Sequence, residues 1–576
     1  MTRLRTRQRN DDRYRWVALT NTTAAVFMST LDGSIVIVAM PAIFRGIHLD
    51  PLDPGNVGYL LWMIMGYRLV QAVLVTTVGR LGDIHGRVKI YNAGFVVFTI
   101  ASILLSFDPF LGGHGALWLI GWRVLQAAGG SMLTANSTAI LTDSFPEGQR
   151  GFALGVNQVA GLSGMFIGLV LGGVLASLDW RAIFWVNVPV GIFGTIWAYT
   201  RLRETSERVG EPIDWWGNIT FAVGLSLLLL SVTFGIQPYH GHTMGWTNPE
   251  VVVGFCAGIV LLTIFVVIER KVSFPMIPLA LFRIRAFAAG NVASFSGAIS
   301  RGGLQFVLII WLQGIWLPLH GYDYSQTPLW AGIFLLPLTG GFISSGPLAG
   351  RLSDRIGARV LTALGMLLSA VSFLGLMLLP VDFHYWEFAG LTFLNGAGSG
   401  MFAAPNTSAV MSSVPNSQRG VASGVRSTFQ NSGTALSIGV FFSVMMLGIA
   451  GSLTRSLTSG LIRHGVPAGT AAHIGATPPT SSLFAAVLGV NPLHRLLAAN
   501  NALDSLPHRE AAILTGRRFF PELLAQAFHH GLVVVFAVAA GLSVIGMLAS
   551  ISRGKKPESR AEASAELLEL PEEAFT

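Results

Sequence analysis

The chain is poor in charged residues and almost without cysteine. Of its 576 residues, 11% are Asp, Glu, Lys or Arg, and Cys256 is the single cysteine. One cysteine excludes an intrachain disulfide framework and a cysteine-based metal site. Soluble domains carry about 25% charged residues. The sequence also lacks G-x-S-x-G, H-E-x-x-H and P-loop patterns, so we expect no enzyme, no cofactor or metal, and no use of ATP.

Apolar sequence is what the chain has in abundance. It is 52% hydrophobic with a mean hydropathy of +0.60. Apolar runs of about 20 residues recur, the length that crosses about 30 Å of hydrocarbon. The sequence therefore predicts an all-α polytopic membrane protein with the lipid bilayer as its surroundings. Fourteen spans are predicted, near residues 16–40, 58–79, 90–107, 116–138, 152–176, 182–200, 216–236, 249–268, 287–312, 328–350, 360–379, 386–410, 421–449 and 529–552.

The 37 lysines and arginines are distributed unevenly between the predicted loops. Segments on the side of the amino terminus hold 25 of them, whereas the short loops on the other side hold only Arg45 and Arg181. The positive-inside rule then places both termini in the cytoplasm of a plasma membrane, the inner membrane in a bacterium. The net charge of +8 thus reflects topology, and we expect no nucleic-acid partner.

An internal repeat divides the chain. The segment 79-GRLGDIHGRVKIYNAG-94 returns as 350-GRLSDRIGARVLTALG-365, and 149-QRGFALGVNQVAGLSG-164 returns as 418-QRGVASGVRSTFQNSG-433. Both copies lie on the cytoplasmic side, which indicates a parallel repeat of two six-helix bundles. The predicted parts are a tail (1–15), an amino-terminal bundle (16–200), a linker with two inserted spans (201–286), a carboxy-terminal bundle (287–552, with an outer loop at 451–528) and a tail (553–576).

Several motifs resemble those of the major facilitator superfamily (MFS), specifically its fourteen-helix drug:proton antiporter group (EmrB/QacA type). The first span carries 31-LDGSIVIVAMP-41, the fourth carries 123-RVLQAAGG-130, and 178-LDWRAIFWVNVPVG-191 also matches the group. The cytoplasmic signature G-x-L-x-D-x-x-G-R stands at 79–87. The resemblance implies the MFS fold and a cytoplasmic gate at these loops, formed by Gly79, Asp83, Gly86 and Arg87, with Asp354 and Arg355 in the repeat.

One departure from the group concerns the fifth span. Its signature G-P-x-x-G-G reads 168-GLVLGG-173, with Leu169 in place of proline. We expect Gly164, Gly168, Gly172 and Gly173 still to allow close helix packing and a bend. The replacement leaves antiport, symport and facilitation open.

Asp32 is the only acidic residue deep within a predicted span. A carboxylate at such a depth costs about 2.5–3.5 kcal/mol on insertion scales, so it requires a function or a partner. One interpretation makes Asp32 the proton site, because apolar surroundings raise the pKa of a carboxyl group whereas a nearby guanidinium lowers it. A change in the distance to an arginine would then load or release a proton. The other is a permanently ionised salt bridge between helices.

Four arginines also lie within predicted spans. Arg123 and Gln126 share a helix face, and we expect Arg123 to take part in proton coupling or to serve as a packing donor. Arg301, with Gln305 one turn away, is the repeat counterpart of Asp32 and is expected to face it across the cavity, as substrate anchor or structural partner. Arg68 is a candidate cavity residue and counter-ion for Asp32, whereas Arg426 is expected to be structural.

Three functions compete on these grounds. The first is proton-coupled export of amphipathic small molecules by a monomer, as in multidrug efflux. The second is export or flipping of a lipid or other anionic metabolite, because four buried arginines against one acid suit a negative headgroup. The third is a non-transporting sensor or scaffold, which would require neither a repeat nor cytoplasmic gate motifs.

Overall fold

The computed structural model describes residues 2–554 apart from 51–55, 205–213, 236–238, 241–243, 274, 325, 415–418, 478, 480, 481, 484, 486–490, 501, 504, 505 and 517. Long helices make up most of it, as expected of apolar sequence whose backbone polar groups must be satisfied within each segment. The first half contains α1 (Thr2–Gly46), α2 (Val57–His85), α3 (Arg87–Ser106), α4 (Gly112–Ser144), α5 (Glu147–Leu178), α6 (Ala182–Trp185) and α7 (Asn187–Arg201).

The inserted helices and the second half follow. The inserted pair is α8 (Trp215–Gly235) and α9 (Pro249–Glu269). The second half contains η2 (Leu279–Arg283), α10 (Arg285–Trp311), η3 (Leu312–Trp316), α11 (Leu317–Leu319), α12 (Thr327–Phe334), α13 (Leu336–Ile356), α14 (Ala358–Leu378), α15 (Tyr385–Ser412), α16 (Arg419–Arg463), α17 (Ala468–Gly475), α19 (Leu493–Ala499), α20 (His508–Leu514) and α21 (Phe519–Ile551).

Twelve helical segments in the described residues are long and apolar enough to cross a membrane. They coincide with twelve of the fourteen predicted spans. The other two predicted spans, 116–138 and 386–410, fall on the long helices α4 and α15, which are not among those twelve. The prediction of an all-α polytopic membrane protein is confirmed, and the count of fourteen spans stays a prediction.

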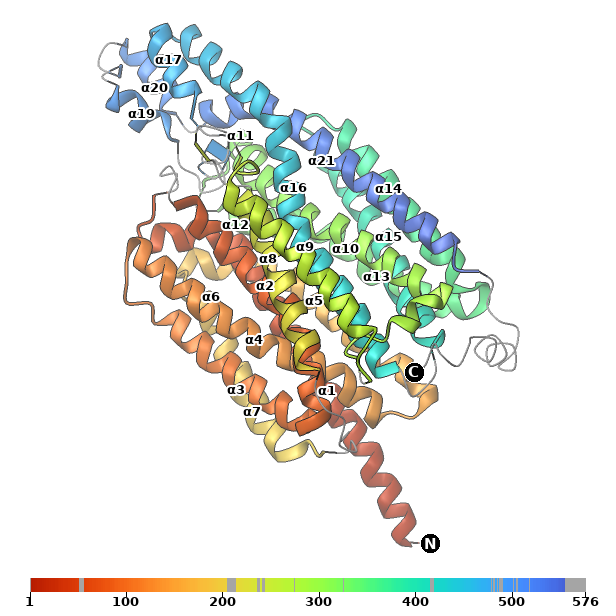
Figure 1. Ribbon diagram of the computed structural model, residues 1–576. Coiled ribbons are helices and arrows are strands. Elements are labelled where there is room, and N and C mark those ends of the chain that lie inside the picture. Colours follow the sequence, from red (N-terminus) through yellow and green to blue (C-terminus); the bar gives the residue numbers. More distant parts are fainter. Residues whose placement is uncertain are drawn as a thin grey trace.

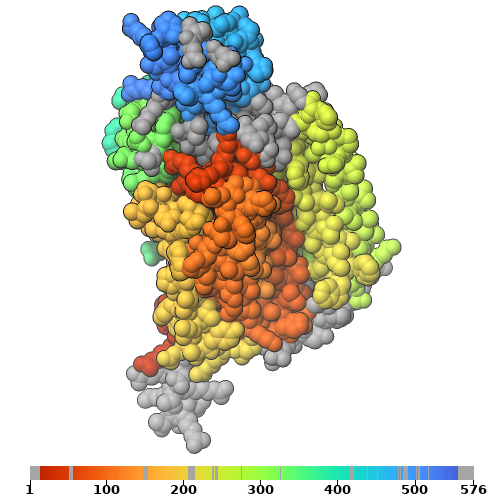
Figure 2. Space-filling model, turned by 90° about the vertical axis from the view of Figure 1, so that its left-hand side faces the viewer, coloured from red at the N-terminus to blue at the C-terminus, as the bar shows by residue number. Residues whose placement is uncertain are grey.

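The helices pack as two groups with a pair beside them (Figure 1). Helices α1 to α7 contact one another, as do α10 and α13 to α16 with α21. The inserted pair α8 and α9 packs as a hairpin whose helix α8 touches α2 and α16, one of the places at which the two groups meet. Figure 2 shows this pair, in yellow-green, along one side of the molecule. This arrangement agrees with two bundles and an insertion between them.

Each group has the same kind of turn between two of its helices. Gly86 joins α2 to α3 with φ 109°, and Gly357 joins α13 to α14 with φ 86°. Positive φ favours glycine, because a side chain meets steric resistance there. The two glycines stand at corresponding positions of the sequence repeat, so the repeat has a structural counterpart at this turn.

The end of the bundle that carries α17, α19 and α20 is called the outer end here, and the end with the amino terminus the inner end (Figure 1). The segment 451–528 was predicted as an outer loop. Within these bounds α16 continues to Arg463 and α21 already begins at Phe519, and the short helices α17, α19 and α20 lie between them. Both extensions are part of an apolar core that includes Leu457, Leu461 and Phe520, and this packing keeps them helical.

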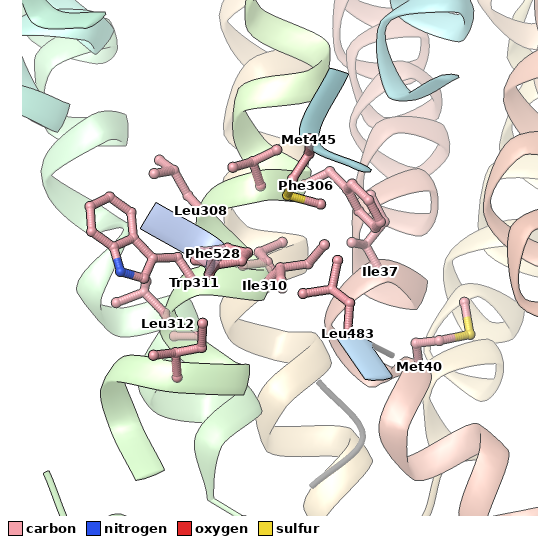
Figure 3. Close-up of a cluster of buried hydrophobic side chains, with 14 of the residues drawn as sticks. Ile37, Met40, Phe306, Leu308, Ile310, Trp311, Leu312, Met445, Leu483 and Phe528 are labelled. Atoms are coloured by element: carbon pink, nitrogen blue, oxygen red, sulfur yellow. The ribbon is translucent and has the colours of Figure 1, made fainter. Parts of the chain in front are cut away.

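An apolar plug joins the two groups near the outer end (Figure 3). Ile37 and Met40 of α1 belong to one buried cluster with Phe306 and Ile310 of α10. The plug is also made by Met445 of α16, Leu483 of the outer segment and Phe528 of α21. Next to it, Gly173 of α5 contacts the backbone of α12 at Leu329. The outer end is therefore closed.

Candidate functional site

Asp32 lies at the centre of a buried network within the first group of helices. Its side chain is 0% exposed. Oδ2 accepts a hydrogen bond from Arg123 NH1 at 2.5 Å, and the two side chains form an ion pair. Oδ1 accepts from Gln126 Nε2 at 3.0 Å and from Asn187 Nδ2 at 2.7 Å. Helices α1, α4 and α7 thus meet at one carboxylate.

The neighbours of Asp32 are also bonded to one another. Arg123 NH1 donates to Gln126 Oε1 at 2.7 Å, and Gln126 Nε2 donates to Ser102 Oγ of α3 at 2.8 Å. The Arg123 guanidinium lies 4.1 Å from the ring centre of Tyr67 on α2. A buried charge that loses its partner costs about 3–5 kcal/mol. Removing the charge of Asp32 or of Arg123 alone is therefore energetically costly.

The structure brings Asp32 together with Arg123 and with Gln126, which was predicted to share a helix face with Arg123, and two further members were missed. Asn187 begins α7, and Ser102 lies on α3. Asn187 falls within the quoted stretch 178–191, so its sequence held a signal. Ser102 had none, because a serine in an apolar helix usually bonds its own backbone, as Ser102 also does to Phe98.

Arg68 lies beside this network without joining it. Its guanidinium is within 3.0 Å of the position that a Cβ on Gly33 would occupy, so the missing side chain makes room for it. The described residues provide it with no hydrogen bond or ion pair, and it is half-buried. The predicted pairing of Arg68 with Asp32 is therefore not seen in this conformation.

Arg301 and Gln305 lie in the second group on α10. The Arg301 guanidinium is 5.5 Å from the ring centre of Phe402 on α15, and no hydrogen bond joins it to Gln305. The contacts of Asp32 are with α4 and α7, and that of Arg301 is with α15, so the expectation that the two face each other across the cavity stays a prediction. Arg426 NH1 donates to Gln430 Oε1 at 3.1 Å within α16, in keeping with a structural role.

Charged side chains join helices at the inner end of the first group. Arg87 contacts Asp83 at 2.8 Å and Asp143 of α4 at 2.6 Å. The carboxylate of Glu204 accepts hydrogen bonds from the backbone N–H groups of Arg87 and Val88. These groups lie in the first turn of α3 and have no partner within the helix. These contacts fix the turn between α2 and α3 to the ends of α4 and α7.

The other predicted gate residues show fewer contacts. Gly79 faces Ala135 of α4, with 3.8 Å between a Cβ built on Gly79 and the Ala135 Cβ. Arg355 is exposed at the end of α13, and the side chain of Asp354 lies outside the described residues. The repeat therefore reproduces the turn, whereas the ion pairs seen in the described structure belong to the first copy.

The glycines of α5 allow other helices to approach closely. A Cβ on Gly168 would lie 2.6 Å from the Leu31 carbonyl oxygen, and one on Gly172 would lie 2.7 Å from that of Ile35. Gly164 meets Phe27 in the same way, so all three face α1, whereas Gly173 faces α12. Helix α5 runs unbroken through them, so their role here is contact.

Comparison with known proteins agrees with this fold. Residues 22–438 match the model of the Major Facilitator Superfamily. The riboflavin transporter RibZ of Clostridioides difficile is 29% identical over 74% of this chain and 88% of its own length. The tetracenomycin C resistance and export protein of Streptomyces glaucescens is 27% identical over 95% and 93%. A bacterial homologue of the human lysosomal transporter Spinster, inward-facing and occupied, superposes with TM-score 0.57 at 15% identity, covering 94% of this chain and 99% of that one.

The family match and the transport and export proteins among the relatives identify a multi-helix membrane transporter rather than an enzyme. The chain belongs to the Major Facilitator Superfamily. The resemblance stated from the sequence motifs is thereby confirmed, and with it the prediction of an integral membrane protein.

Proposed function

We propose that this transporter exports amphipathic small molecules from the cytoplasm in exchange for protons. It would act as a monomer in the plasma membrane, the inner membrane of a bacterium, with both termini in the cytoplasm. Asp32 is the proposed proton site, and Arg123 is the partner that loads and releases it. Arg68, Gln126, Arg301 and Gln305 remain the candidates for contact with the substrate.

The Asp32 network is the observation that carries this proposal. Apolar enclosure favours the neutral form of a carboxyl group, whereas a guanidinium at hydrogen-bond distance favours the ionised form. Asp32 is fully buried and also bonded to Arg123, so both influences act on one group. A helix movement that separates Arg123 from Asp32 favours proton uptake, and its reversal favours release.

Contacts between the helix groups support the alternation that this exchange requires. The apolar plug closes the outer end, and Thr76 of α2 bonds to Thr428 of α16 across the groups. Opening toward the outside requires α5 and α12 to separate at Gly173 and Leu329. The ion pairs of Arg87 with Asp83 and Asp143 then act as an inner latch, because they join helix ends on the opposite side.

The direction of transport is inferred from the relatives. A protein named for tetracenomycin C resistance and export aligns over 95% of this chain. The positive-inside charge distribution determines the orientation of the protein in the membrane, not the direction of transport. Given that orientation, substrate enters from the inner end and leaves past the plug.

Reconstitution in proteoliposomes tests the proposal. A pH gradient is imposed, and accumulation of cationic, neutral and anionic amphiphiles is compared with accumulation at equal pH on both sides. One proton moved through a gradient of one pH unit provides about 1.4 kcal/mol, a tenfold substrate ratio. We expect accumulation only with the gradient. Equal substrate movement with and without it would identify a facilitator instead.

A further inference from the structure

Helices α10 and α15 cross in the second group with a fixed register. Asn406 Nδ2 donates to Ser294 Oγ at 2.7 Å, and it also reaches the Gly290 carbonyl oxygen at 3.3 Å. One turn closer to the inner end, Gly290 faces Val410. The two helices are therefore antiparallel, and a residue further along α10 pairs with one equally far back along α15.

The same register continues toward the outer end. By this spacing Arg301 corresponds to Ser399 and Gln305 to Asn395, and the contacts of Arg301 with Phe402 and of Trp311 with Phe388 agree with it. Residues spaced by four, seven and eleven lie on one face of a helix. We call this row the α10–α15 ladder; its members are Ser294, Arg301, Gln305, Asn395, Ser399 and Asn406.

Beyond the Ser294–Asn406 rung, hydrogen-bond donors of the ladder have no acceptor. Gln305 Nε2, Asn395 Nδ2 and Ser399 Oγ are buried without a partner in the structure. Asn395 is 1% exposed and Ser399 is 4% exposed. The described residues offer Arg301 no ion pair or hydrogen bond. An unsatisfied buried polar group costs about 1–3 kcal/mol, so several together indicate an absent ligand.

The missing partner is an anion, which neither α10 nor α15 supplies to the ladder. Helix α10 has no acidic residue, and the only one on α15 is Glu387, which is exposed in its first turn. The ladder atoms that are buried without a partner are mostly donors: Asn406 Oδ1 can only accept, and the Ser399 hydroxyl can donate as well as accept. One guanidinium with neutral donors around it balances one negative charge, and it binds a planar oxyanion through two parallel bonds.

We propose that the α10–α15 ladder binds the carboxylate, or a similar singly charged oxyanion, of an amphipathic substrate. This inference rests on the proposed transport function and names its substrate class. The location suits such a molecule. Phe402 lies under the guanidinium, and the residue after Gln305 is Phe306 of the plug, so the charged group has buried aromatic and aliphatic neighbours.

Binding of three probes with one apolar body tests the proposal. Pyrenebutyrate, pyrenebutanol and pyrenebutylamine are titrated onto the purified transporter in detergent, and energy transfer from tryptophan to pyrene is recorded. At about pH 7 the first carries a negative charge and the third a positive charge. We expect the carboxylate to bind at least about tenfold more tightly than the alcohol, because a hydrogen bond to a charged group contributes about 1.5–3 kcal/mol.

Variants of the ladder then locate the effect. Arg301→Gln is expected to weaken pyrenebutyrate binding at least about tenfold and to leave pyrenebutanol binding unchanged. Asn395→Ala with Ser399→Ala is expected to weaken only the carboxylate probe, by a smaller factor. Arg463→Gln, an exposed arginine at the outer end of α16, is the matched control and is expected to stay within about twofold of the wild type.

Two results would overturn the proposal: tighter binding of the amine than of the carboxylate, or an equal loss for all three probes in Arg301→Gln. If Arg301→Gln does not fold, Arg301→Lys and the Asn395–Ser399 double variant answer the same question. Equilibrium binding needs no pH gradient, so it is independent of coupling. A wild-type protein that binds pyrenebutyrate selectively but accumulates no probe under a gradient would contradict the proposed proton exchange and leave the substrate class standing.

Discussion

Asp32 on α1 and Arg301 on α10 occupy corresponding positions of the repeat, yet their surroundings differ. Asp32 receives bonds from Arg123, Gln126 and Asn187, all within its own group of helices. Arg301 has only the face of Phe402 beside it, among donors that lack acceptors. Asp32 thus has a counter-charge within its own group of helices, whereas the described residues provide Arg301 with none. A charge balanced internally suits a proton switch, and an unbalanced one suits a ligand.

The largest effect is expected when the charge of Asp32 is removed. Asp32→Asn keeps the size of the side chain but eliminates proton binding, so accumulation driven by a pH gradient should vanish while downhill exchange persists. It also leaves Arg123 as a buried charge without a partner, which costs about 3–5 kcal/mol. Transport in proteoliposomes and a thermal melt measure the two consequences.

The double variant Asp32→Asn with Arg123→Gln separates stability from coupling. It removes both charges, so thermal stability should recover, while gradient-driven accumulation should stay absent. If either variant still concentrates substrate against its gradient, Asp32 is a structural charge and the proton path lies elsewhere.

The next effect is expected when Arg301 is given an acidic partner, as Arg123 has in Asp32. Gln305→Glu places a carboxylate one helical turn from Arg301, where it supplies the missing partner. We expect affinity for pyrenebutyrate to fall by about tenfold or more, because substrate must compete with an internal acid. Gln305→Leu is the control, since it removes the donor without adding a charge. Undiminished binding of pyrenebutyrate in Gln305→Glu would show that the anion is held elsewhere.

A smaller effect concerns the closure that brings the two groups together. Gly173→Val places side-chain atoms against the backbone of α12 at Leu329, and overpacking of this kind costs about 1–3 kcal/mol. The outward-closed state should lose population, and a cysteine introduced at Met40, within the plug, should become more reactive toward an external thiol reagent. Gly155→Ala is the control, because no atom lies within 4 Å of the added Cβ. Equal reactivity in the two variants would argue against this contact as the outer gate.

The smallest effect is expected at the inner latch. Asp83→Asn removes one of the two acids on Arg87, and both side chains of the Asp83–Arg87 pair are partly exposed, at 26% and 19%. A pair of this kind contributes up to about 1 kcal/mol. The transport rate should fall a few-fold while substrate affinity stays the same, which the pyrene titration and the transport assay measure together. A loss of affinity with an unchanged rate of conformational exchange would assign Asp83 to the binding site.

The sequence by itself determined the helices, the repeat and one side of the charge network. Apolar length and backbone hydrogen bonding leave few alternatives to membrane helices, so the spans followed from composition. The spacing of Arg123 and Gln126 placed them on one face, and depth along the helix placed Asp32 at a similar level. These properties are local, because each depends on a single helix.

Only the tertiary structure decided which helix each face meets. Helical periodicity fixes a face of a helix but not the helix that packs against it, so the sequence did not show that Asp32 contacts α4 and α7, that Arg301 contacts α15, or that Arg68 lies beside Asp32 without pairing with it. Ser102, Asn395 and Ser399 carried no distinguishing signal, because their importance arises from the register of α3 against α4 and of α10 against α15. The helical extensions of α16 and α21 likewise depend on packing between segments far apart in the chain. Register and neighbour are set by side-chain contacts between helices, which no single segment encodes.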